Sequence, residues 1–433
     1  MSADMHQRCL RIYGGRLLDP ATGTDRIGDL CIADGRIIAM GETPSDFTAD
    51  ETIDATGLWV CPGLIDLSNR VREPGEEHKG TIASETRAAA SGGVTTLVVP
   101  PDTVPPIDNP SVVELIRDRA KDSSHSWVLT LGAMTVGLQG QQLTEMGALR
   151  REGVVGVSNG LEGIRDTRVL RRALEYAATQ DLPVFIQAQD AWLSEGGCAH
   201  EGAVATRLGL PGIPSAAEAA EVSRVLALIR LTHARVHFCR LSNHRALSLI
   251  AEAIQQGLPV TCDVAAHQLY LTEMDLSDYN PNVHLQPPLR TQRDLQALRT
   301  GLANGTVNAI CSDHQPHDLD AKSAPFMETE AGASTVETLL PLVLRLAEEG
   351  ELSLLDALAC VTQNPAQILG LEESGSIAPG HRADVILVDP EAWWTVDADQ
   401  LLSEGKNSPF LGWELKGRVR RTLLAGRTLY ELI

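Results

Sequence analysis

Paired cysteines, long apolar runs and an excess of positive charge are all missing from this sequence of 433 residues. Its eight cysteines are scattered, none forms a Cys-x-x-Cys pair, and several lie inside apolar runs such as HFCRL and NAICSD. This pattern predicts reduced thiols in a cytoplasmic protein and argues against a disulfide framework or a zinc knuckle. No run of about eighteen apolar residues occurs, and the opening stretch MSADMHQRCLRIYGG has no apolar signal core. We therefore expect neither a membrane span nor a secretion signal.

Basic residues are few relative to acidic ones. The chain has 36 Lys and Arg against 57 Asp and Glu, a formal charge of −21. This balance argues against nucleic acid or an anionic membrane as a partner, and it is typical of a soluble protein. An acidic small substrate stays possible, because a local arginine can override the overall field.

The two ends of the chain differ in character from its middle. Short apolar segments alternate with Gly, Asp and Pro near both ends, as in CLRIYGGRLLDP and GSIAPGHRADVILVDP, which indicates strands joined by turns. We predict that residues 1–57 and 371–433 meet in one small composite β-sandwich domain. Residues 58–370 would form a second, larger domain.

The middle alternates apolar strand candidates with helical stretches such as RDTRVLRRALEYAATQ, whose apolar residues recur at intervals of three and four. This β–α rhythm predicts an α/β fold, a (β/α)8 TIM-type barrel. An open doubly wound sheet is the alternative, but no Gly-x-Gly-x-x-Gly follows the first strand. The eight predicted strands are residues 58–67, 93–99, 126–135, 153–158, 183–187, 235–241, 259–264 and 307–313.

Chemistry in such a barrel takes place at the carboxyl ends of the strands. A hydrolytic metal centre there needs three or more converging N, O or S ligands. The candidates among histidines and carboxylates are few, and arginine cannot ligate a cation. From the residues alone we expect a barrel mouth without a metal. The side chains after the strands are Ser68, Arg70, Asp102, Asn159, Gln187, Arg240, His267 and the SDHQPH cluster with Asp313, His314 and His317.

Several of these residues also have structural interpretations. Asp313 and His314 could form a satisfied pair at a strand end, and His267 could be a packed or hydrogen-bonded core histidine. The Arg72–Glu73 step could be a surface ion pair, which would contribute little. A buried Arg70 or Arg240 would need an acid, and Asp313 is the nearest candidate.

Longer motifs bring a specific resemblance. From about residue 8 to the C-terminus, the chain resembles the dihydroorotases of the amidohydrolase superfamily. The resemblance implies a metal-dependent hydrolase barrel with a small β domain. The motifs are PGLIDLSNRVREPGEEHKGTIASETRAAASGGVTT, PPDTVPPIDNP, EGAVATRLGLPGIPSAAE, LQPPLR, SDHQPH, TQNPAQILGL and GSIAPGHRADVILVD.

The chain departs from this family at the positions that hold the metal. Active members carry His-x-His after the first strand, a bridging aspartate after the fourth, and histidines after the fifth and sixth. Of the six expected ligands, the resemblance leaves the aspartate after the eighth strand, Asp313. The other five positions hold Ser68, Arg70, Asn159, Gln187 and Arg240.

The positions that contact substrate are only partly kept. Arg72 matches the arginine that clamps the substrate carboxylate, and His317 matches the last histidine of the Asp-His-x-Pro-His loop. Two family asparagines have become Asp102, which would repel an anionic substrate, and Gln286. We expect these four residues to form at most a vestigial substrate site.

Together these features predict a protein that has kept its scaffold and lost its chemistry. The resemblance implies a non-catalytic dihydroorotase-like chain that assembles with the aspartate carbamoyltransferase catalytic chain in a large hetero-oligomer of pyrimidine biosynthesis. We expect no catalytic residues, no zinc and no dihydroorotase activity. Two alternatives stay open: a divergent cyclic-amide hydrolase of dihydroorotase or hydantoinase type with a reduced or absent metal site, and a sensor of a pyrimidine intermediate.

Overall fold

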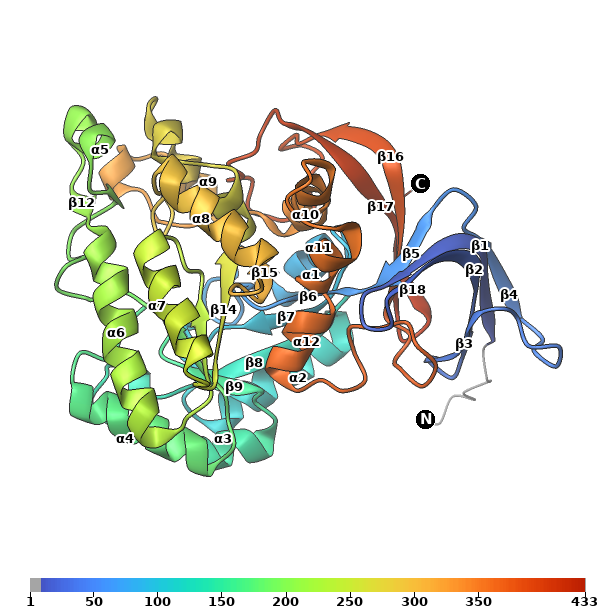
Figure 1. Cartoon of the computed structure of the whole chain (residues 1–433), viewed down its shortest axis with the longest axis horizontal. Helices are drawn as coiled ribbons and strands as arrows, with labels where there is room; N and C mark the ends of the chain where they lie inside the picture. Colours follow the sequence, from blue (N-terminus) through green and yellow to red (C-terminus); the bar gives the residue numbers. More distant parts are fainter. Residues whose placement is uncertain (1–8, 433) are drawn as a thin grey trace.

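The computed structural model describes residues 9–432, so the first eight residues of the predicted terminal β domain lie outside it. Its central feature is a sheet of eight parallel strands surrounded by helices (Figure 1). The predicted (β/α)8 barrel is confirmed. In sheet order its strands are β15 (Ala309–Cys311), β14 (Val260–Ala265), β13 (Val236–Cys239), β10 (Val184–Gln187), β9 (Gly156–Ser158), β8 (Trp127–Ala133), β7 (Val94–Val99) and β6 (Leu64–Asp66).

The barrel closes just beyond the ends of β6 and β15. The backbone N–H of Arg70 donates to the carbonyl of His314 at 2.9 Å, and the N–H of His314 donates to the carbonyl of Ser68 at 3.2 Å. The Asp66 carboxylate accepts a further bond from the backbone N–H of Ser312 at 2.9 Å. These bonds bring the residues after the first and the last strand into direct contact.

The first predicted strand, residues 58–67, is in fact two strands. β5 (Trp59–Pro62) pairs with strands of the terminal sheet, whereas β6 joins the barrel. Gly63 lies between them, and a Cβ there would meet the Thr95 side chain at 2.2 Å. Only glycine therefore lets the chain pass from one sheet to the other at this point.

Helices cover the outside of the barrel because each has one apolar face. In α4 (Thr167–Thr179) the buried residues Leu170, Ala173, Leu174 and Ala177 recur at intervals of three and four, and Asp166 caps the N-terminus. The other helices of this layer are α1 (Ile82–Ser91), α2 (Pro110–Ser123), α3 (Met146–Glu152), α6 (Ser215–Thr232), α7 (His244–Gln255), α8 (Gln292–Ala303), α10 (Leu339–Glu348), α11 (Leu354–Ala359) and α12 (Gln363–Leu369).

The loops after β10, β14 and β15 contain short strands, short helices and 3-10 turns. These loop elements are β11 (Ala199–His200), α5 (Ala203–Leu208), β12 (Gly212–Ile213), α9 (Leu319–Lys322) and the 3-10 turns η3 (Glu273–Leu276) and η5 (Phe326–Glu328).

None of the helices in residues 9–432 is both long enough and apolar enough to cross a membrane.

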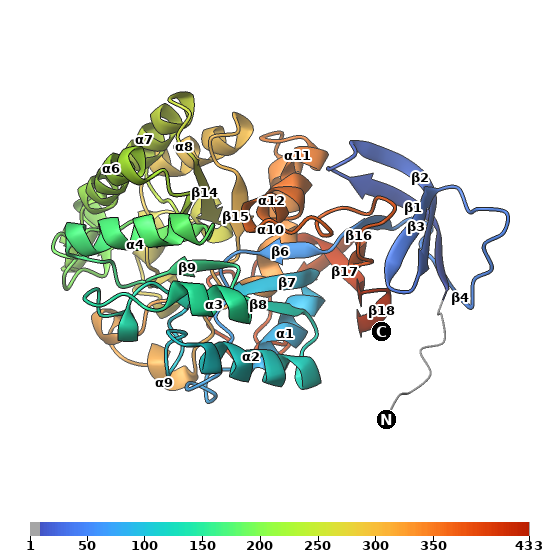
Figure 2. The same ribbon diagram turned by 90° about the horizontal axis from the view of Figure 1, so that it is seen from below.

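Strands from both ends of the chain form one further hydrogen-bonded sheet with an apolar core of its own. Figures 1 and 2 show this sheet beside the barrel, so it does not cover the carboxyl ends of the barrel strands. Its strands are β1 (Leu10–Asp19), β2 (Thr24–Ala33), β3 (Arg36–Gly41), β4 (Glu51–Asp54), β5, β16 (Val385–Thr395), β17 (Glu414–Leu424) and β18 (Arg427–Glu431).

Candidate functional site

The predicted site residues do come together at the carboxyl end of the barrel. Gln187 ends β10, and Arg240 and Asn159 directly follow β13 and β9. All six family ligand positions are buried, with at most 6% of each residue exposed to solvent; they are Ser68, Arg70, Asn159, Gln187, Arg240 and Asp313.

The Arg240 guanidinium lies at the centre of these positions. Its Nη1 donates to Asp313 Oδ1 at 2.6 Å and to Ser68 Oγ at 2.9 Å. Its Nε donates to Gln187 Oε1 at 2.7 Å. Burial lowers the pKa of Arg240, but the electrostatic contributions of Asp313 and further neighbours such as Asp263 together outweigh burial and raise it, so the guanidinium stays charged. One arginine thus joins four of the six positions.

A second arginine balances the remaining charge. Arg70 donates to Asp102 Oδ2 from Nη2 at 2.7 Å and from Nε at 3.2 Å, and its Nη1 lies 3.8 Å from Asp313 Oδ1. Burial raises the pKa of Asp102, but Arg70 and then Arg240 lower it below its usual value. Asp102 was predicted to repel an anionic substrate; its charge is instead neutralised by Arg70. Two guanidiniums and two carboxylates leave the cluster with no net charge.

Asn159 is separate from this cluster and is held by its own partners. Its Oδ1 accepts from Thr135 Oγ1 at 2.7 Å, while its Nδ2 donates to the carbonyls of Leu138 and Glu162 at 3.0 and 2.8 Å. Two carbonyl oxygens facing this side chain suit an amide and would repel a carboxylate. The surroundings therefore match the asparagine that the sequence carries.

Arg72 and His317 are in contact, and both are engaged within the chain. The Arg72 guanidinium donates to Glu76 Oε2 at 2.9 Å and to the carbonyl of Pro316 at 2.8 Å, and it lies 3.0 Å from His317 Nε2. The suggested Arg72–Glu73 pair is wrong, because Glu73 pairs with Arg119 at 2.6 Å. Burial and then Arg72 lower the pKa of His317 to about 2, so its ring is neutral.

The suggested Asp313–His314 pair is also wrong. His314 Nε2 lies 2.8 Å from a carboxylate oxygen of Glu85 in α1, which also accepts from Ser403 Oγ at 2.6 Å. The side chains of His314 and Glu85 are both fully buried. Glu85 ties the loop after β15 to the first helix and to the C-terminal segment. The sequence held no signal for it, because Glu85 falls in an ordinary helical pattern.

The ring of His267 is buried and makes no hydrogen bond within residues 9–432. Both ring nitrogens lack a hydrogen-bond partner there, as does Asp313 Oδ2. Burial lowers the pKa of His267 to about 4, with Asp313 and Arg240 acting in opposite directions. The ring is therefore neutral at physiological pH.

Arg240 and Asp313 have backbone φ angles of 52° and 51°, and Arg72 has 64°. The left-handed region is uncommon for residues other than glycine and costs free energy, and such residues cluster at binding and catalytic sites. Strained backbone at three site residues is what a scaffold built around a functional centre would retain.

A divalent metal does not fit the family positions as this chain fills them. The remaining carboxylate, Asp313, already holds a guanidinium nitrogen at 2.6 Å, and a second guanidinium lies 3.8 Å away. Ser68 and Gln187 direct their oxygens toward Arg240. A cation placed here would displace Arg240 and meet two positive charges.

One other group of side chains has the composition of a metal site. Potential ligand atoms of His237, Cys239 and Asp263 lie within 4.8 Å of one another in the barrel interior. Each is already accommodated: His237 Nε2 is 3.0 Å from Asp263 Oδ2, and its Nδ1 is 2.8 Å from Thr261 Oγ1. Burial raises the pKa of the Cys239 thiol, so it stays protonated and is a poor ligand. The group forms a hydrogen-bonded part of the core.

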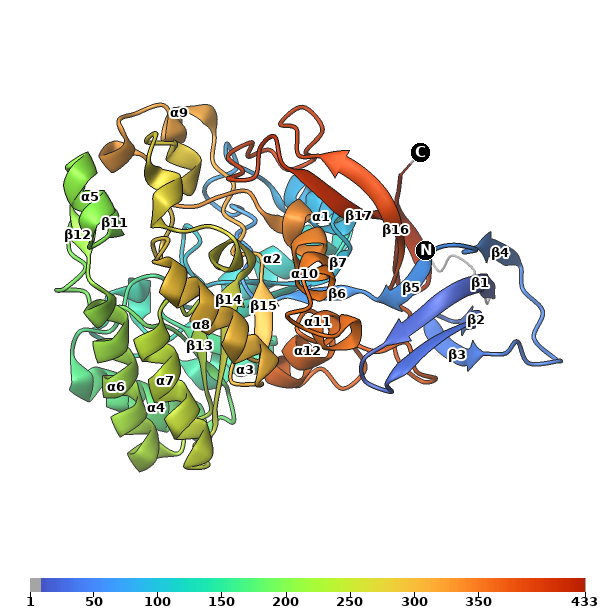
Figure 3. The ribbon, with the colours of Figure 1, turned by 45° about the horizontal axis from the view of Figure 1, so that its top comes forward.

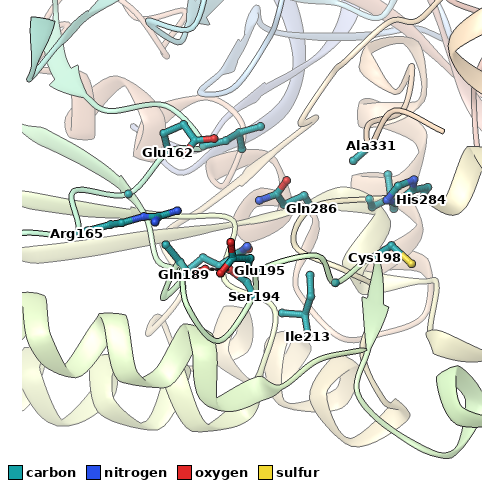
Figure 4. A pocket seen from close by; sticks show the side chains of 15 residues that line it. Glu162, Arg165, Gln189, Ser194, Glu195, Cys198, Ile213, His284, Gln286 and Ala331 are labelled. Carbon is teal, nitrogen blue, oxygen red and sulfur yellow. Dashed lines mark hydrogen bonds between the residues drawn. The ribbon is translucent and has the colours of Figure 1, made fainter. Parts of the chain in front are cut away.

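A cavity of about 230 Å³ is lined by residues of several loops, and Figure 4 shows Arg165 extending toward Gln286 across it. Of the four predicted substrate positions, Gln286 lines this cavity, whereas Arg72, Asp102 and His317 do not. None of the six family ligand positions lines it either. A smaller space of about 10 Å³ touches Asn159 and Gln187. The old centre is filled by its own side chains.

The barrel with an attached sheet of terminal strands, and a cluster of former ligand positions at the strand ends, define an amidohydrolase-type scaffold. Comparison with solved structures agrees: an L-hydantoinase (dihydropyrimidinase) from Arthrobacter aurescens superposes with a TM-score of 0.88 at 24% identity, covering 98% of this chain and 97% of that one. A D-hydantoinase gives 0.84 at 25% identity, with 98% and 95% coverage.

The chain belongs to the dihydroorotase-like family. Residues 57–245 match the family described as dihydro-orotase-like, and residues 281–430 match an amidohydrolase family. A dihydroorotase-like protein of Pseudomonas aeruginosa is 49% identical over 98% of this chain and 99% of its own length. A protein of Geobacter metallireducens named dihydroorotase is 42% identical, with 98% and 99% coverage. The predicted family is confirmed.

Proposed function

We propose that this protein is a non-catalytic, cytoplasmic member of the dihydroorotase-like family, and that it serves as a structural subunit of an aspartate carbamoyltransferase complex in pyrimidine biosynthesis. The observation that carries the proposal is the position of Arg240. Its guanidinium occupies the space at Asp313 where a metal would have to bind, and it is hydrogen-bonded to Asp313, Ser68 and Gln187.

Loss of hydrolysis follows from the chemistry that such a site would need. Cleavage of an unactivated cyclic amide in this family relies on a metal that generates hydroxide and polarises the carbonyl. A carboxylate acting alone as general base contributes on the order of 10²- to 10⁴-fold, well short of typical enzymatic accelerations. The Asp313 carboxylate is moreover already bound at Oδ1 by the Arg240 guanidinium.

The sensor alternative receives less support. The family's carboxylate clamp corresponds to Arg72, which is bound to Glu76 and to the carbonyl of Pro316. A substrate-like anion would have to break both contacts. The cavity lined by Gln286 could admit a small molecule, but it does not reach Arg72.

Assembly supplies a reason for keeping an intact scaffold after the chemistry is lost. The relative in Pseudomonas aeruginosa is itself named only as dihydroorotase-like, whereas others are named dihydroorotase. The names of the relatives fit a family in which active and inactive chains share one fold. A subunit that holds other chains in place needs that fold and its surface, and it does not need a metal centre.

Co-expression tests the proposal directly. The chain and the aspartate carbamoyltransferase chain of the same organism should co-purify and elute as one large species in size-exclusion chromatography, without hydrolysis of dihydroorotate. Two separate peaks under all conditions would overturn the assembly role. Metal-dependent turnover of dihydroorotate or a hydantoin, lost in the Asp313→Asn variant, would revive the hydrolase alternative.

A further inference from the structure

Two neighbouring segments at the mouth of the barrel expose large apolar side chains. Met274 follows β14 and is 56% exposed, while Leu319 and Met327 follow β15 and are 82% and 54% exposed. Tyr279, in the loop after η3, is 46% exposed. The two segments thus expose four large apolar side chains, and exposed apolar side chains of this size are characteristic of surfaces that bind other proteins.

Specific contacts hold the two segments together. Lys322 of α9 donates from Nζ to the carbonyl of Pro281 at 3.1 Å and to that of Glu330 at 2.6 Å. The rings of His284 and Phe326 lie 4.9 Å apart. Tyr279 donates to the carbonyl of Leu208 in α5 at 2.8 Å, and Figures 1 and 3 place α5 and α9 at the same end of the barrel. These contacts hold in place the backbone that carries the exposed side chains.

The charge on these segments has one sign. Residues 273–284 and 318–330 contain seven Asp and Glu and a single basic residue, Lys322. The Lys322 side chain is buried, with its charge directed at backbone carbonyls. We call Met274, Tyr279, Leu319 and Met327, together with the exposed acids Asp278, Asp320 and Glu328, the apolar–acidic surface.

The negative charge of the apolar–acidic surface determines which kind of partner would bind it. A second copy of this chain would bring like charges face to face, which costs free energy. A protein face with an apolar centre and a rim of Lys and Arg would match both features of the surface. The apolar–acidic surface also lies at the end of the barrel where an active enzyme would have to admit substrate. Because Arg240 and its partners fill the centre in this chain, a partner protein could cover this end of the barrel without blocking a substrate.

We propose that the apolar–acidic surface docks the aspartate carbamoyltransferase chain through a basic-rimmed, apolar face of that partner. This inference rests on the proposed function and specifies the face by which the chain would assemble. Met274 and Leu319 supply apolar contact, and Asp320 and Glu328 supply charge complementarity.

Titration calorimetry of the full-length chain with the transcarbamoylase chain tests the proposal. The variants Met274→Ser/Leu319→Ser and Asp320→Lys/Glu328→Lys should each weaken binding at least tenfold. Two matched controls should bind like the wild type: Leu231→Ser/Ile254→Ser, which alters exposed apolar residues of α6 and α7, and Glu114→Lys/Asp118→Lys, which reverses exposed acids of α2. Circular dichroism should show all four variants folded.

The outcomes separate this inference from the function on which it rests. If the wild type binds and every variant binds equally well, the docking face lies elsewhere while the assembly role stands. If the wild type does not bind the transcarbamoylase at all, the assembly role itself fails. If the isolated chain self-associates and the surface variants abolish this, the occupant is a second copy and the proposal is wrong.

Discussion

At the scale of single residues, the decisive feature is the buried Arg240, at a position where the family resemblance predicts a histidine. Arg240 keeps its charge because Asp313 lies 2.6 Å away, and Ser68 and Gln187 complete its hydrogen bonds. A buried ion pair of this kind adds little stability relative to an apolar replacement, but removal of one partner leaves a buried charge uncompensated.

Replacement of Asp313 should therefore be costly. We expect Asp313→Asn to lower the free energy of unfolding by about 3–5 kcal/mol, because Arg240 would be left buried and unpaired. Urea denaturation monitored by fluorescence measures the change. The double variant Arg240→Gln/Asp313→Asn should be more stable than the single one, because neither charge remains; a double variant as unstable as the sum of both single changes would contradict the pairing.

His267 should make stability depend on pH. Its pKa is about 4 in the folded chain because burial disfavours the charged ring, against 6.5 when the ring is exposed. The unfolded chain therefore binds a proton that the folded chain does not, and stability falls as the pH drops from about 6.5 to about 4. In the variant His267→Gln, the decrease in unfolding free energy over this pH range should be smaller by up to about 3 kcal/mol. The measurement is the difference in unfolding free energy between variant and wild type at several pH values, and equal pH profiles would contradict it.

At the scale of elements, the ends of the barrel strands fix where chemistry could occur. The six predicted ligand positions come from well-separated segments, yet β6, β10, β13 and β15 bring Ser68, Gln187 and Asp313 within hydrogen-bonding reach of the Arg240 guanidinium. The strand framework therefore still holds the geometry of a centre, although the side chains have changed.

This geometry predicts that a metal site can be rebuilt. The variant Ser68→His/Arg70→His/Gln187→His/Arg240→His, which keeps Asp313, should bind about one equivalent or more of Zn²⁺, because imidazoles would then converge with a carboxylate. Elemental analysis after dialysis measures the metal content. The same four positions changed to Gln serve as the control, since this removes both arginines without supplying ligands. A folded four-histidine variant that binds no more zinc than the control would contradict the placement of the centre.

At the scale of the whole molecule, the acidic charge has a consequence for assembly. The formal charge of the chain is −21, and residues 273–284 and 318–330, which carry the apolar–acidic surface, have no exposed Lys or Arg. Contacts between opposite charges at the rim of an interface are screened by salt.

Binding of the transcarbamoylase chain should therefore weaken with salt. We expect the dissociation constant to rise roughly tenfold between about 0.05 and 0.5 M NaCl. The variant Asp320→Lys/Glu328→Lys should show a smaller dependence on salt, and Met274→Ser/Leu319→Ser should keep the wild-type dependence. Binding that strengthens with salt would indicate a purely apolar interface and contradict the charge argument.

Much of this could be predicted from the sequence, because local patterns encode local structure. Alternation of apolar runs with amphipathic helices was enough to predict eight strands and a barrel, since each run has the period of the element that it forms. The sequence also indicated side chains that the structure brings together, because Ser68 and Arg240 come shortly after strands and Gln187 ends one. The division of residues 58–67 into β5 and β6 was missed, because a continuous apolar run does not reveal that its two halves pair with different sheets.

The sequence by itself thus determined the barrel, the family and the identity of the side chains at its centre. The sequence offered Asp313 as a partner for either arginine, and only the tertiary structure decided which polar groups meet: Arg240 with Asp313, Arg70 with Asp102, and His314 with Glu85. The physical reason is that ion pairing depends on distance and burial, and these partners are 73, 32 and 229 residues apart in the chain. Their contact arises from closure of the barrel, which no local pattern records.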